Sequence, residues 1–295
     1  MTYLGEGWDS TAVLVGGRWV ERRPRRTEIG PQLLRETVVM PWLASLLPLP
    51  VPVPVVVSED PVVVRHELVP GGEVASPGAV QGRQLGEFLR ALHAAPVAEA
   101  VRRGAGPRPL PVERFRAEVD VPGGEELLAK LDDLPADTVV HGDLGPEHVL
   151  GRDGVLTGVI DFGDLHIGDA AIDLAWALHC TPPEFAAAFA ETYGVTAELR
   201  ERALTWHQLG PWHEVLHGNA TGDREMAEIG LAGVLERLGG GVSPHQQRLV
   251  RRTRCPGFAG TAAAPRTAGS ARPRSAATTA GRPAARGSWS SSRSP

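Results

Sequence analysis

The chain of 295 residues has little of the features that mark secreted and membrane proteins. It holds only two cysteines, Cys180 and Cys255, which lie far apart and are too few to indicate a disulfide framework. The most apolar stretch, 43–57, is interrupted by four prolines, whereas a membrane helix needs roughly 20 consecutive apolar residues. The N-terminus lacks the basic flank and apolar core of a signal peptide. We therefore expect a soluble cytoplasmic protein with no membrane partner.

Acidic residues are absent from the C-terminal part of the chain. All 35 Asp and Glu lie at or before Glu236, where 19 basic residues leave a formal charge of −16, whereas the remainder carries 11 basic residues. A composition of Ala, Arg, Ser, Pro and Gly cannot bury enough apolar surface to offset chain entropy, so we predict that residues 239–295 form a disordered basic tail. Such a tail can bind nucleic acid. Its aromatic residues are only Phe258 and Trp289, and we expect no nucleic-acid partner.

The most informative stretch is 138–173, which places carboxylates and histidines between short runs of β-branched residues. A first apolar run ends at the sequence H-G-D, which contains Asp143. Two further runs flank the Asp-Gly dipeptide at 153–154, a pair typical of two-residue hairpin turns. That hairpin ends in D-F-G, which begins with Asp161. Asp143, His148 and Asp161 therefore lie at strand ends, and strand pairing can bring them together.

Phosphoryl transfer from a nucleotide needs a carboxylate that orients or deprotonates the attacking hydroxyl, and ligands that hold Mg²⁺ on the phosphates. Asp143 suits the first task and Asp161 the second. The pattern H-G-D-x-x-x-x-H followed by I-D-F-G resembles the catalytic and metal loops of protein kinases. The segments HGDLGPEHVL, LTGVIDFGD and GDAAIDLAW resemble the aminoglycoside and macrolide phosphotransferase family, and the likeness extends over about residues 3–238. An isolated H-x-D pair is usually an ordinary surface loop, so the full spacing carries the prediction.

The resemblance implies a bilobal protein-kinase-like fold of the α+β class. We assign residues 1–66 to a small N-terminal lobe, built on an antiparallel sheet, that binds the nucleotide. Residues 67–238 would form a mainly helical C-terminal lobe that carries the catalytic loops and the acceptor site. The nucleotide would lie between the two lobes.

Carried over position by position, the resemblance implies that Asp143 is the catalytic base and that His141 and Asp173 support its loop. Asp161 would bind Mg²⁺. Most kinase-like enzymes have Asn where this chain has His148, whereas macrolide kinases and aminoglycoside kinases that act on the 2″-hydroxyl resemble it in using His. Because Mg²⁺ prefers hard oxygen ligands, a neutral imidazole is a weak ligand and can act through water. The expected cofactors are ATP or GTP and Mg²⁺.

The first hairpin contains the predicted phosphate-binding groups. Gly5, Gly7 and Ser10 lie in a glycine-bearing segment ahead of a strand, and glycine allows backbone N–H groups to approach phosphates closely. A single G-x-G is more often an ordinary turn. In the segment WVERRPR, which resembles the family's first hairpin, Arg22 takes the phosphate-binding position. By the same resemblance, Glu36 in L-L-R-E pairs with that cation.

A predicted hinge follows two β-rich segments, 51–57 and 62–64. The Pro/Gly bend over 65–72 leaves the sheet and resembles the connection between the lobes of the family. The nucleotide base would contact backbone groups near Glu67 and Leu68. Side chains at those positions do not distinguish adenine from guanine.

Periodic apolar residues predict helices in the rest of the chain. The predicted helical ranges are 28–47, a helix around 85–92 that ends before Pro96, a weaker pattern over 112–131 broken at 122–124, and 170–179, 183–193, 197–217 and 224–238. Aromatic and histidine side chains at helical spacing are more often packed than ligating. This group comprises Trp206, His207, Trp212, His213 and His217.

Residues 161–236 hold 13 acidic and 3 basic side chains. Acidic walls concentrate cations, and a polyamine sugar can pair several ammonium groups with them. The predicted acceptor-binding residues are Asp164, Glu184, Glu191, Glu214 and Asp223. The alternative is an acidic surface that only keeps the protein soluble.

We therefore expect a monomeric small-molecule kinase that transfers the γ-phosphate of a nucleoside triphosphate to a hydroxyl of a cationic acceptor, an aminoglycoside antibiotic. Two alternatives remain open. One is a kinase of a macrolide or of another small alcohol such as choline. The other is a non-catalytic nucleotide-binding remnant.

Overall fold

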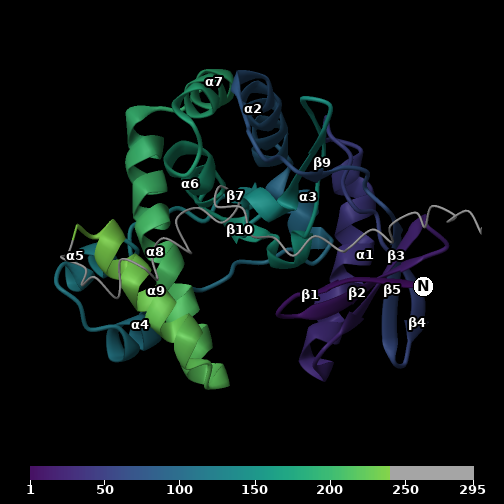
Figure 1. The fold of residues 1–295 in the computed structure, drawn as a ribbon, viewed down its shortest axis with the longest axis horizontal. Helices are drawn as coiled ribbons and strands as arrows, with labels where there is room; N and C mark the ends of the chain where they lie inside the picture. The colour runs from purple at the N-terminus through teal and green to yellow at the C-terminus, as the bar shows by residue number, and fades with distance from the viewer. Residues whose placement is uncertain (240–295) are drawn as a thin grey trace, which may run out of the picture. The chain divides into compact units, whose positions relative to one another are not determined.

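The computed structural model describes residues 1–239, so the predicted disordered tail lies outside the described residues (Figure 1). The N-terminal part is an antiparallel sheet with strand order β1-β2-β3-β5-β4. Its strands are β1 (Thr2–Glu6), β2 (Ser10–Val15), β3 (Trp19–Pro24), β4 (Val55–Glu59) and β5 (Val62–Glu67). Helix α1 (Gly30–Ala44) follows the short turn Thr27–Ile29 and packs against β3, β4 and β5.

Two tight hairpins form where the sequence predicts them. Gly16 and Gly17, with φ of 61° and 71°, connect β2 to β3. Asp153 and Gly154, with φ of 51° and 81°, connect β8 (Val149–Arg152) to β9 (Val155–Val159). Positive φ at both central residues is the conformation that matches the twist of paired strands. The second hairpin delivers the chain directly to Asp161.

The strands beside the predicted hinge differ from the expectation. The predicted strand 51–57 starts only at Val55, because Pro52 and Pro54 lack the N–H groups that a ladder needs. Strand β5 continues to Glu67, beyond the predicted end at 64, because its last residues pair with β3. The hinge segment therefore begins within the sheet.

The C-terminal part is mainly helical and carries two small sheets. Its helices are α2 (Ala79–His93), α3 (Val97–Arg102), α4 (Val112–Glu118), α5 (Gly124–Ala129), α6 (Ala171–His179), α7 (Pro183–Tyr193), α8 (Ala197–Thr221) and α9 (Arg224–Arg237). One sheet pairs β7 (Thr138–Val140) with β10 (His166–Gly168), and the other has the order β6-β8-β9 with β6 at Gly72–Glu73. Two short turns, Pro146–His148 and Phe162–Asp164, complete the site region.

The predicted helices occur with small differences in their ends. The weak pattern over 112–131 is divided into α4 and α5 at Gly123, which has a φ of 81°. Helix α8 continues four residues beyond the predicted end and contains Pro211. Strands β6 and β10 were not predicted, because each has only two or three residues. Within residues 1–239, no helix is long and apolar enough to cross a membrane.

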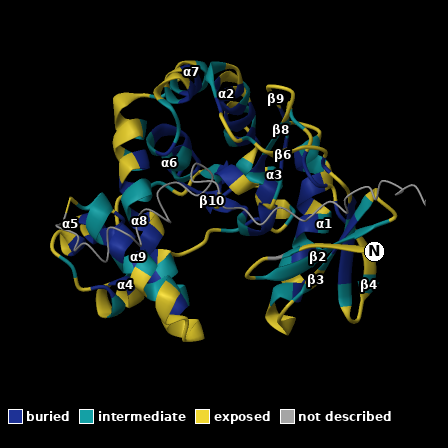
Figure 2. Cartoon of the chain, viewed as in Figure 1, coloured by how far each residue is buried: buried dark blue, intermediate teal, exposed yellow. Residues whose placement is uncertain are grey.

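Buried residues form two clusters, and the larger one also includes Val39, Met40 and Leu43 of α1 (Figure 2). The larger cluster joins α2, α6 and α7 to the strands that lead into the candidate site, and it includes Phe88, Phe185 and Phe189. The smaller one joins α4, α5, α8 and α9 around Phe115 and Trp212, both fully buried. The core position predicted for Trp212 is confirmed. The first cluster provides a fixed base under the loops that follow β7 and β9.

Candidate active site

The loop after β7 carries Asp143, and its backbone N–H groups bond to a side chain of α6. The N–H groups of His141 and Gly142 donate to the carboxylate of Asp173, at 2.7 and 2.9 Å. Gly142 has a φ of 85°, and a Cβ there would lie 2.5 Å from the carbonyl oxygen of Asp164. Only glycine fits this turn without strain. The sequence H-G-D thus presents Asp143 at a defined position after the strand.

The buried ring of His141 also holds this loop in place through hydrogen bonds. It is fully buried, and its Nε2 donates to the carbonyl of Ile160 at 3.0 Å. Its Nδ1 then accepts the N–H of Asp143 at 3.3 Å. His141 therefore connects the catalytic loop to the end of β9. This contact explains how two strand ends are kept side by side.

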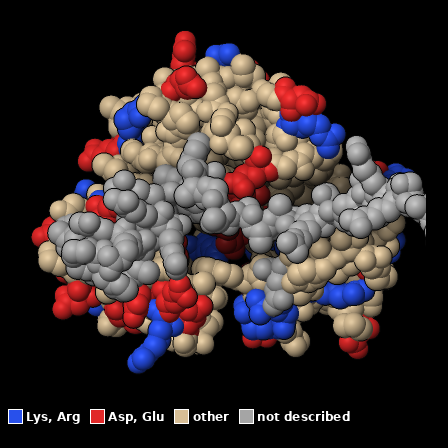
Figure 3. All heavy atoms as spheres, viewed as in Figure 1, with Lys and Arg blue, Asp and Glu red and all other residues tan. Residues whose placement is uncertain are grey.

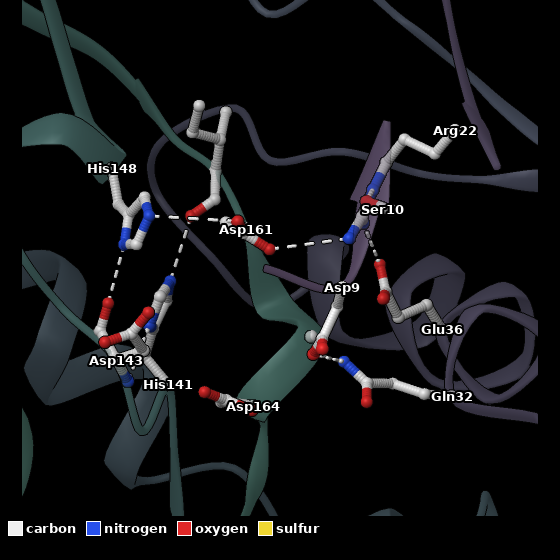
Figure 4. A network of polar contacts seen from close by, with 12 residues as sticks. Asp9, Ser10, Arg22, Gln32, Glu36, His141, Asp143, His148, Asp161 and Asp164 are labelled. Carbon is white, nitrogen blue, oxygen red and sulfur yellow. Dashed lines mark hydrogen bonds and ion pairs between the residues drawn. The ribbon is translucent and has the colours of Figure 1, made fainter. Parts of the chain in front are cut away.

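Asp161 occupies a left-handed backbone conformation, with φ of 65° and ψ of 67°, at the end of β9. This conformation turns its carboxylate between the guanidinium of Arg22 and the imidazole of His148, which come from different parts of the chain (Figure 4). Oδ1 lies 3.5 Å from Nη2 of Arg22, and Oδ2 lies 3.8 Å from Nε2 of His148. Burial would raise the pKa of Asp161, but Arg22 and His148 hold it below the ordinary value.

His148 is oriented by a hydrogen bond that leaves its second nitrogen facing Asp161. Nδ1 donates to the carbonyl of Asp143 at 2.6 Å, so Nε2 is the nitrogen with the free lone pair. Metal-binding histidines commonly have this arrangement. Burial would lower the pKa of His148, but Asp161 and Asp143 raise it. Deprotonation, which metal binding requires, therefore competes with attraction to two carboxylates.

These residues fit a magnesium site of the kind that leaves most positions to water and phosphate. Among residues 1–239 no group of three or more His, Cys, Asp or Glu side chains could hold a metal by itself. Mg²⁺ usually takes only one or two protein carboxylates and completes its shell with waters and phosphates. The half-exposed carboxylate of Asp161 can provide one such hard oxygen, with His148 beside it.

The surroundings of Asp143 favour binding of a proton. Partial burial raises its pKa, and the carboxylates of Asp164 and Asp161 add to this rise while His148 opposes it. The side chain still reaches solvent at the mouth of the site. A carboxylate with a raised pKa binds a proton more readily, which favours general-base chemistry.

Arg22 and Glu36 form the buried ion pair that the sequence predicts. Nη1 of Arg22 lies 2.6 Å from Oε2 of Glu36, and the two side chains are only 11% and 2% exposed. Nε of Arg22 donates to the hydroxyl of Ser10 at 3.3 Å. Burial raises the pKa of Glu36, and the guanidinium of Arg22 opposes this rise. Arg35, which sequence reasoning missed, adds a second link by donating to the carbonyl of Gly163 at 2.9 Å.

The glycine-bearing segment is partly strand. Gly5 lies within β1 rather than in a loop, and the loop consists of Gly7, Trp8 and Asp9. The N–H of Gly7 donates to the carbonyl of Ser10 at 3.0 Å. Trp8 stacks on His217 of α8, with ring centroids 3.8 Å apart. Sequence reasoning did not predict this contact, because its partners are separated by most of the folded chain.

The predicted hinge groups are already engaged in the sheet. The N–H of Leu68 donates to the carbonyl of Arg18 at 2.8 Å. The side chain of Glu67 pairs with that of Arg18 at 2.7 Å, and its carbonyl lies 2.8 Å from Nδ1 of His66. A nucleotide base would therefore meet Glu67 and Leu68 with part of their backbone bonding capacity in use.

The predicted acceptor residues lie in different places. Asp164 is within the electrostatic reach of Asp143 and forms an ion pair with Arg108, a partner that the sequence does not indicate. Glu184 and Glu191 belong to α7, which packs on α2. Glu214 lies on α8, and burial raises its pKa.

Asp223 has a local structural function, because it caps α9 by accepting the N–H of Met226 at 3.0 Å. The structure thus brings Asp164 to the cluster of Asp143 and Asp161 (Figure 4), and it distributes the other four acids over α7, α8 and the start of α9.

Two curated proteins resemble parts of the chain. Viomycin phosphotransferase from Streptomyces vinaceus is 38% identical over 120 residues, which are 39% of this chain and 34% of that protein. Aminoglycoside 3′-phosphotransferase from Streptomyces fradiae is 30% identical over 151 residues, which are 42% of this chain and 56% of that protein. The chain therefore spans about a third to just over a half of the length of these relatives.

Solved structures resemble most of the described fold. The GDP and kanamycin complex of APH(2″)-IIia has a TM-score of 0.67 at 24% identity and covers 80% of this chain and 92% of its own. A macrolide 2′-phosphotransferase type I has a TM-score of 0.63 at 26% identity and covers 82% and 91%. The predicted kinase-like fold, with an antiparallel N-terminal sheet and a mainly helical C-terminal part, is confirmed. Since the sequence model described as the phosphotransferase enzyme family matches residues 1–212, the chain belongs to that family.

Proposed function

We propose that this protein transfers the γ-phosphoryl group of a nucleoside triphosphate to a hydroxyl of an aminoglycoside antibiotic. The observation that carries the proposal is the convergence of Asp143, His148 and Asp161 from the C-terminal part with Arg22 from β3. Kinase chemistry needs this combination of a base, an acidic metal ligand and a phosphate-binding cation. Membership of the phosphotransferase family supports the same reaction class.

In the proposed mechanism, Asp143 accepts a hydrogen bond from the acceptor hydroxyl and orients its oxygen for in-line attack on the γ-phosphorus. As the new O–P bond forms, the bond from the γ-phosphorus to the β-phosphate oxygen breaks, Asp143 takes the hydroxyl proton, and the nucleoside diphosphate leaves. His141 and Asp173 keep the loop in place during this step. Arg22 lies beside the transferred phosphoryl group, where its charge offsets the negative charge of the phosphate oxygens. Asp161, with His148, would hold Mg²⁺, which supplies further neutralisation of phosphate charge when bound.

We propose that residues 1–66 form the nucleotide-binding lobe and residues 67–238 the catalytic lobe. Gly7 and Ser10 would lie over the phosphates, close to Arg22, whereas Gly5 would act only through the shape of β1. Backbone groups around Glu67 and Leu68 would contact the base. Structures with bound GDP among the similar proteins support a purine nucleotide, and ATP and GTP are both candidates.

The choice of a cationic acceptor rests on charge. Residues 161–236 hold 13 acidic and 3 basic side chains. Acidic side chains also gather over α4, α5 and α9 on the face drawn in Figure 3, and of these three helices only α9 belongs to that range. Such a surface attracts a polyamine sugar more strongly than a macrolide. The proposed acceptor contacts are Asp164 and Glu214, with Glu184, Glu191 and Asp223 as more distant contributors to the field. One of the similar proteins is named an aminoglycoside 3′-phosphotransferase, which supports an aminoglycoside as the acceptor.

A macrolide is the second candidate acceptor. The observation in its favour is the macrolide 2′-phosphotransferase structure, which matches over 82% of this chain at 26% identity. A macrolide offers one amine and a broad apolar face, so its binding depends little on an acidic surface. The two candidates therefore differ in their expected response to salt.

A substrate panel with a salt series tests the proposal. Kanamycin, viomycin, a macrolide and choline are compared as acceptors with ATP and GTP, and Asp143→Asn provides the background. We expect aminoglycoside phosphorylation, with a KM that rises from low to high salt as screening weakens long-range attraction. Preference for the macrolide, or an aminoglycoside KM indifferent to salt, would reject the aminoglycoside assignment. A nucleotide-dependent rise in melting temperature without any turnover would identify a non-catalytic nucleotide-binding protein.

A further inference from the structure

A chain of buried polar groups extends from the catalytic loop into the core of the helical part. The carboxylate of Asp173 accepts the N–H groups of His141 and Gly142, and its Oδ2 also lies 3.0 Å from Nε2 of His93. On the other side of the imidazole, Nδ1 of His93 lies 2.8 Å from the hydroxyl of Tyr193. Each of the three side chains comes from a different helix, α6, α2 and α7.

The protonation of the two ends sets the direction of these hydrogen bonds. Burial alone would raise the pKa of Asp173, but the hydrogen bond from His93, with the N–H groups of the loop, holds it below the ordinary value. Asp173 is therefore an acceptor only, and Nε2 of His93 carries the proton. Burial raises the pKa of Tyr193 to about 12, so its hydroxyl remains a donor. Tyr193 O–H thus donates to Nδ1 of His93, and His93 Nε2–H donates to Asp173.

The side chains of His93 and Asp173 have little access to water. The side chain of His93 is 6% exposed and that of Asp173 is fully buried. In such surroundings a carboxylate that loses a donor is left with an unmet hydrogen-bonding requirement, and it must move or rearrange. The position of Asp173 therefore depends on His93 as well as on its own helix.

Close packing of α2 on α7 places His93 beside Tyr193. Gly82 and Gly86 lie on one face of α2, and His93 follows seven residues after Gly86 on that face. A Cβ at Gly86 would lie 3.0 Å from the carbonyl oxygen of Phe189, and one at Gly82 would collide with the backbone of Phe185. The absence of side chains at both glycines lets the helix backbones approach. The edge-to-face contact of the two rings, with centroids 5.6 Å apart, follows from this approach.

We propose that His93 and Tyr193 are positioning residues for phosphoryl transfer, which act through Asp173 on the loop that carries Asp143. This inference rests on the function proposed above for Asp143. Neither residue touches the candidate site. Tyr193 orients His93, His93 orients Asp173, and Asp173 holds the backbone of the catalytic loop.

The proposal predicts an effect on turnover rather than on binding. A shift of the loop moves Asp143 away from the acceptor hydroxyl, and misplacement by about 1 Å can cost about 100-fold in rate. Arg22 and Asp161, which are proposed to face the nucleotide, are tied directly to Glu36 and His148, and they are connected to His93 only indirectly, through the loop. The nucleotide KM should therefore be retained when the series of hydrogen bonds is broken.

The test compares graded substitutions at the two positions. His93→Leu removes both hydrogen bonds, and we expect kcat to fall about 10-fold to 100-fold with both KM values within about twofold. Tyr193→Phe keeps the ring and removes one hydrogen bond, for which we expect about a fivefold fall. His93→Gln keeps one donor and one acceptor at similar reach and should restore most of the rate. Leu89→Ala, a fully buried position on α2 outside the series, is the control for general destabilisation.

Amide hydrogen exchange of residues 139–144 provides a readout that does not depend on the acceptor. The N–H groups of His141 and Gly142 are protected by Asp173, so His93→Leu should increase their exchange while His93→Gln and Leu89→Ala should not. Unchanged protection in His93→Leu, or a fall in kcat equal to that of Leu89→Ala, would overturn the positioning role. If the wild-type protein phosphorylates no acceptor, the proposed function fails, and the exchange measurement still decides the structural part of the inference.

Discussion

The catalytic loop, 141–143, and the β1–β2 loop, 7–9, contribute to the same polar network but are held by different kinds of contact (Figure 4). The catalytic loop donates two backbone N–H groups to a fully buried carboxylate. The β1–β2 loop is held by exposed groups. Asp9 pairs with Arg26 at 3.0 Å, with 36% and 49% of their side chains exposed, and Trp8 is 47% exposed although it stacks on His217.

These two kinds of contact differ in strength. An exposed ion pair typically contributes about 0–1 kcal/mol, whereas a hydrogen bond to a charged group contributes about 1.5–3 kcal/mol. Asp143, the proposed base, thus lies on the loop that resists displacement. The β1–β2 loop, which is proposed to cover the phosphates, can adjust to a ligand. Substitutions in the catalytic loop should change turnover, and substitutions in the β1–β2 loop should change the affinity for the nucleotide.

The largest effect is expected at Asp143. We predict that Asp143→Asn lowers kcat by about 10² to 10⁴ and leaves nucleotide affinity within a few-fold, because loss of a general base affects the chemical step. Turnover kinetics and a nucleotide titration measure the two quantities. Asp153→Asn is a matched control, since Asp153 lies in the exposed β8–β9 turn and Asn accepts its positive φ. Normal turnover in Asp143→Asn would remove Asp143 from the mechanism.

Asp161→Asn should weaken metal and nucleotide binding more than it slows the chemical step. Asn tolerates the left-handed conformation at this position, so the fold should be retained. Loss of the charge that faces Arg22 and His148 should weaken nucleotide binding and raise the Mg²⁺ concentration needed for half-maximal activity by about tenfold or more. A Mg²⁺ titration at fixed nucleotide checks this. An unchanged Mg²⁺ requirement would argue against Asp161 as the metal ligand.

The contacts that hold the β1–β2 loop are exposed, whereas the ion pair of Arg22 and Glu36 in the same N-terminal part is buried. Glu36→Gln leaves a buried guanidinium without its main partner, and we predict a loss of about 3–5 kcal/mol in the free energy of unfolding. Glu125→Gln breaks an exposed contact with Arg116 and should leave stability nearly unchanged. Denaturant unfolding compares the two. Equal losses would show that burial does not govern the strength of these pairs.

Much of the catalytic loop can be predicted from the sequence, because its determinants are local. The Asp-Gly dipeptide at 153–154 specifies the hairpin that delivers Asp161, and Gly142 specifies the turn before Asp143. Strand pairing then brings both to one end of the small sheets. The pairing of Arg22 with Glu36 could be expected only from the family resemblance, since 14 positions separate them.

Contacts between distant segments could not be predicted. The pairing of Arg108 with Asp164 and the stacking of Trp8 on His217 depend on how loops and helices meet in space. The same limit applies to the acidic residues of the helical part. Their excess is visible in composition, but the sequence does not show that Asp223 caps α9. Short strands such as β10 form because a neighbour is present, and their own residues carry no distinctive pattern.

Buried polar groups should also make the helical part sensitive to pH. Burial, with Arg237 and His179 nearby, lowers the pKa of His207 to about 3. Since its unfolded value is near 6.5, the unfolded chain takes up this proton first, and the stabilising contribution is complete above pH 6.5 and declines below it. We predict a loss of about 1–2 kcal/mol at pH 5. Thermal melts between pH 7.5 and 5 should show a flatter dependence in His207→Leu, and an identical dependence would rule out His207 as its source.

The smallest effect on stability is expected at the tip of the β1–β2 loop. Trp8→Ala removes a stacked pair that contributes about 0.5–1.5 kcal/mol, and because the pair joins β1–β2 to α8, its loss should free the loop from the helical part. We predict a nucleotide KM raised by a few-fold, an unchanged kcat and a melting temperature close to that of the wild-type protein. His217→Ala should reproduce these values, and the double variant should add little, because both substitutions break one contact. A fall in kcat comparable to that of His93→Leu would mean that the β1–β2 loop also positions the reacting groups, and the distinction between a fixed catalytic loop and an adjustable phosphate loop would then be wrong.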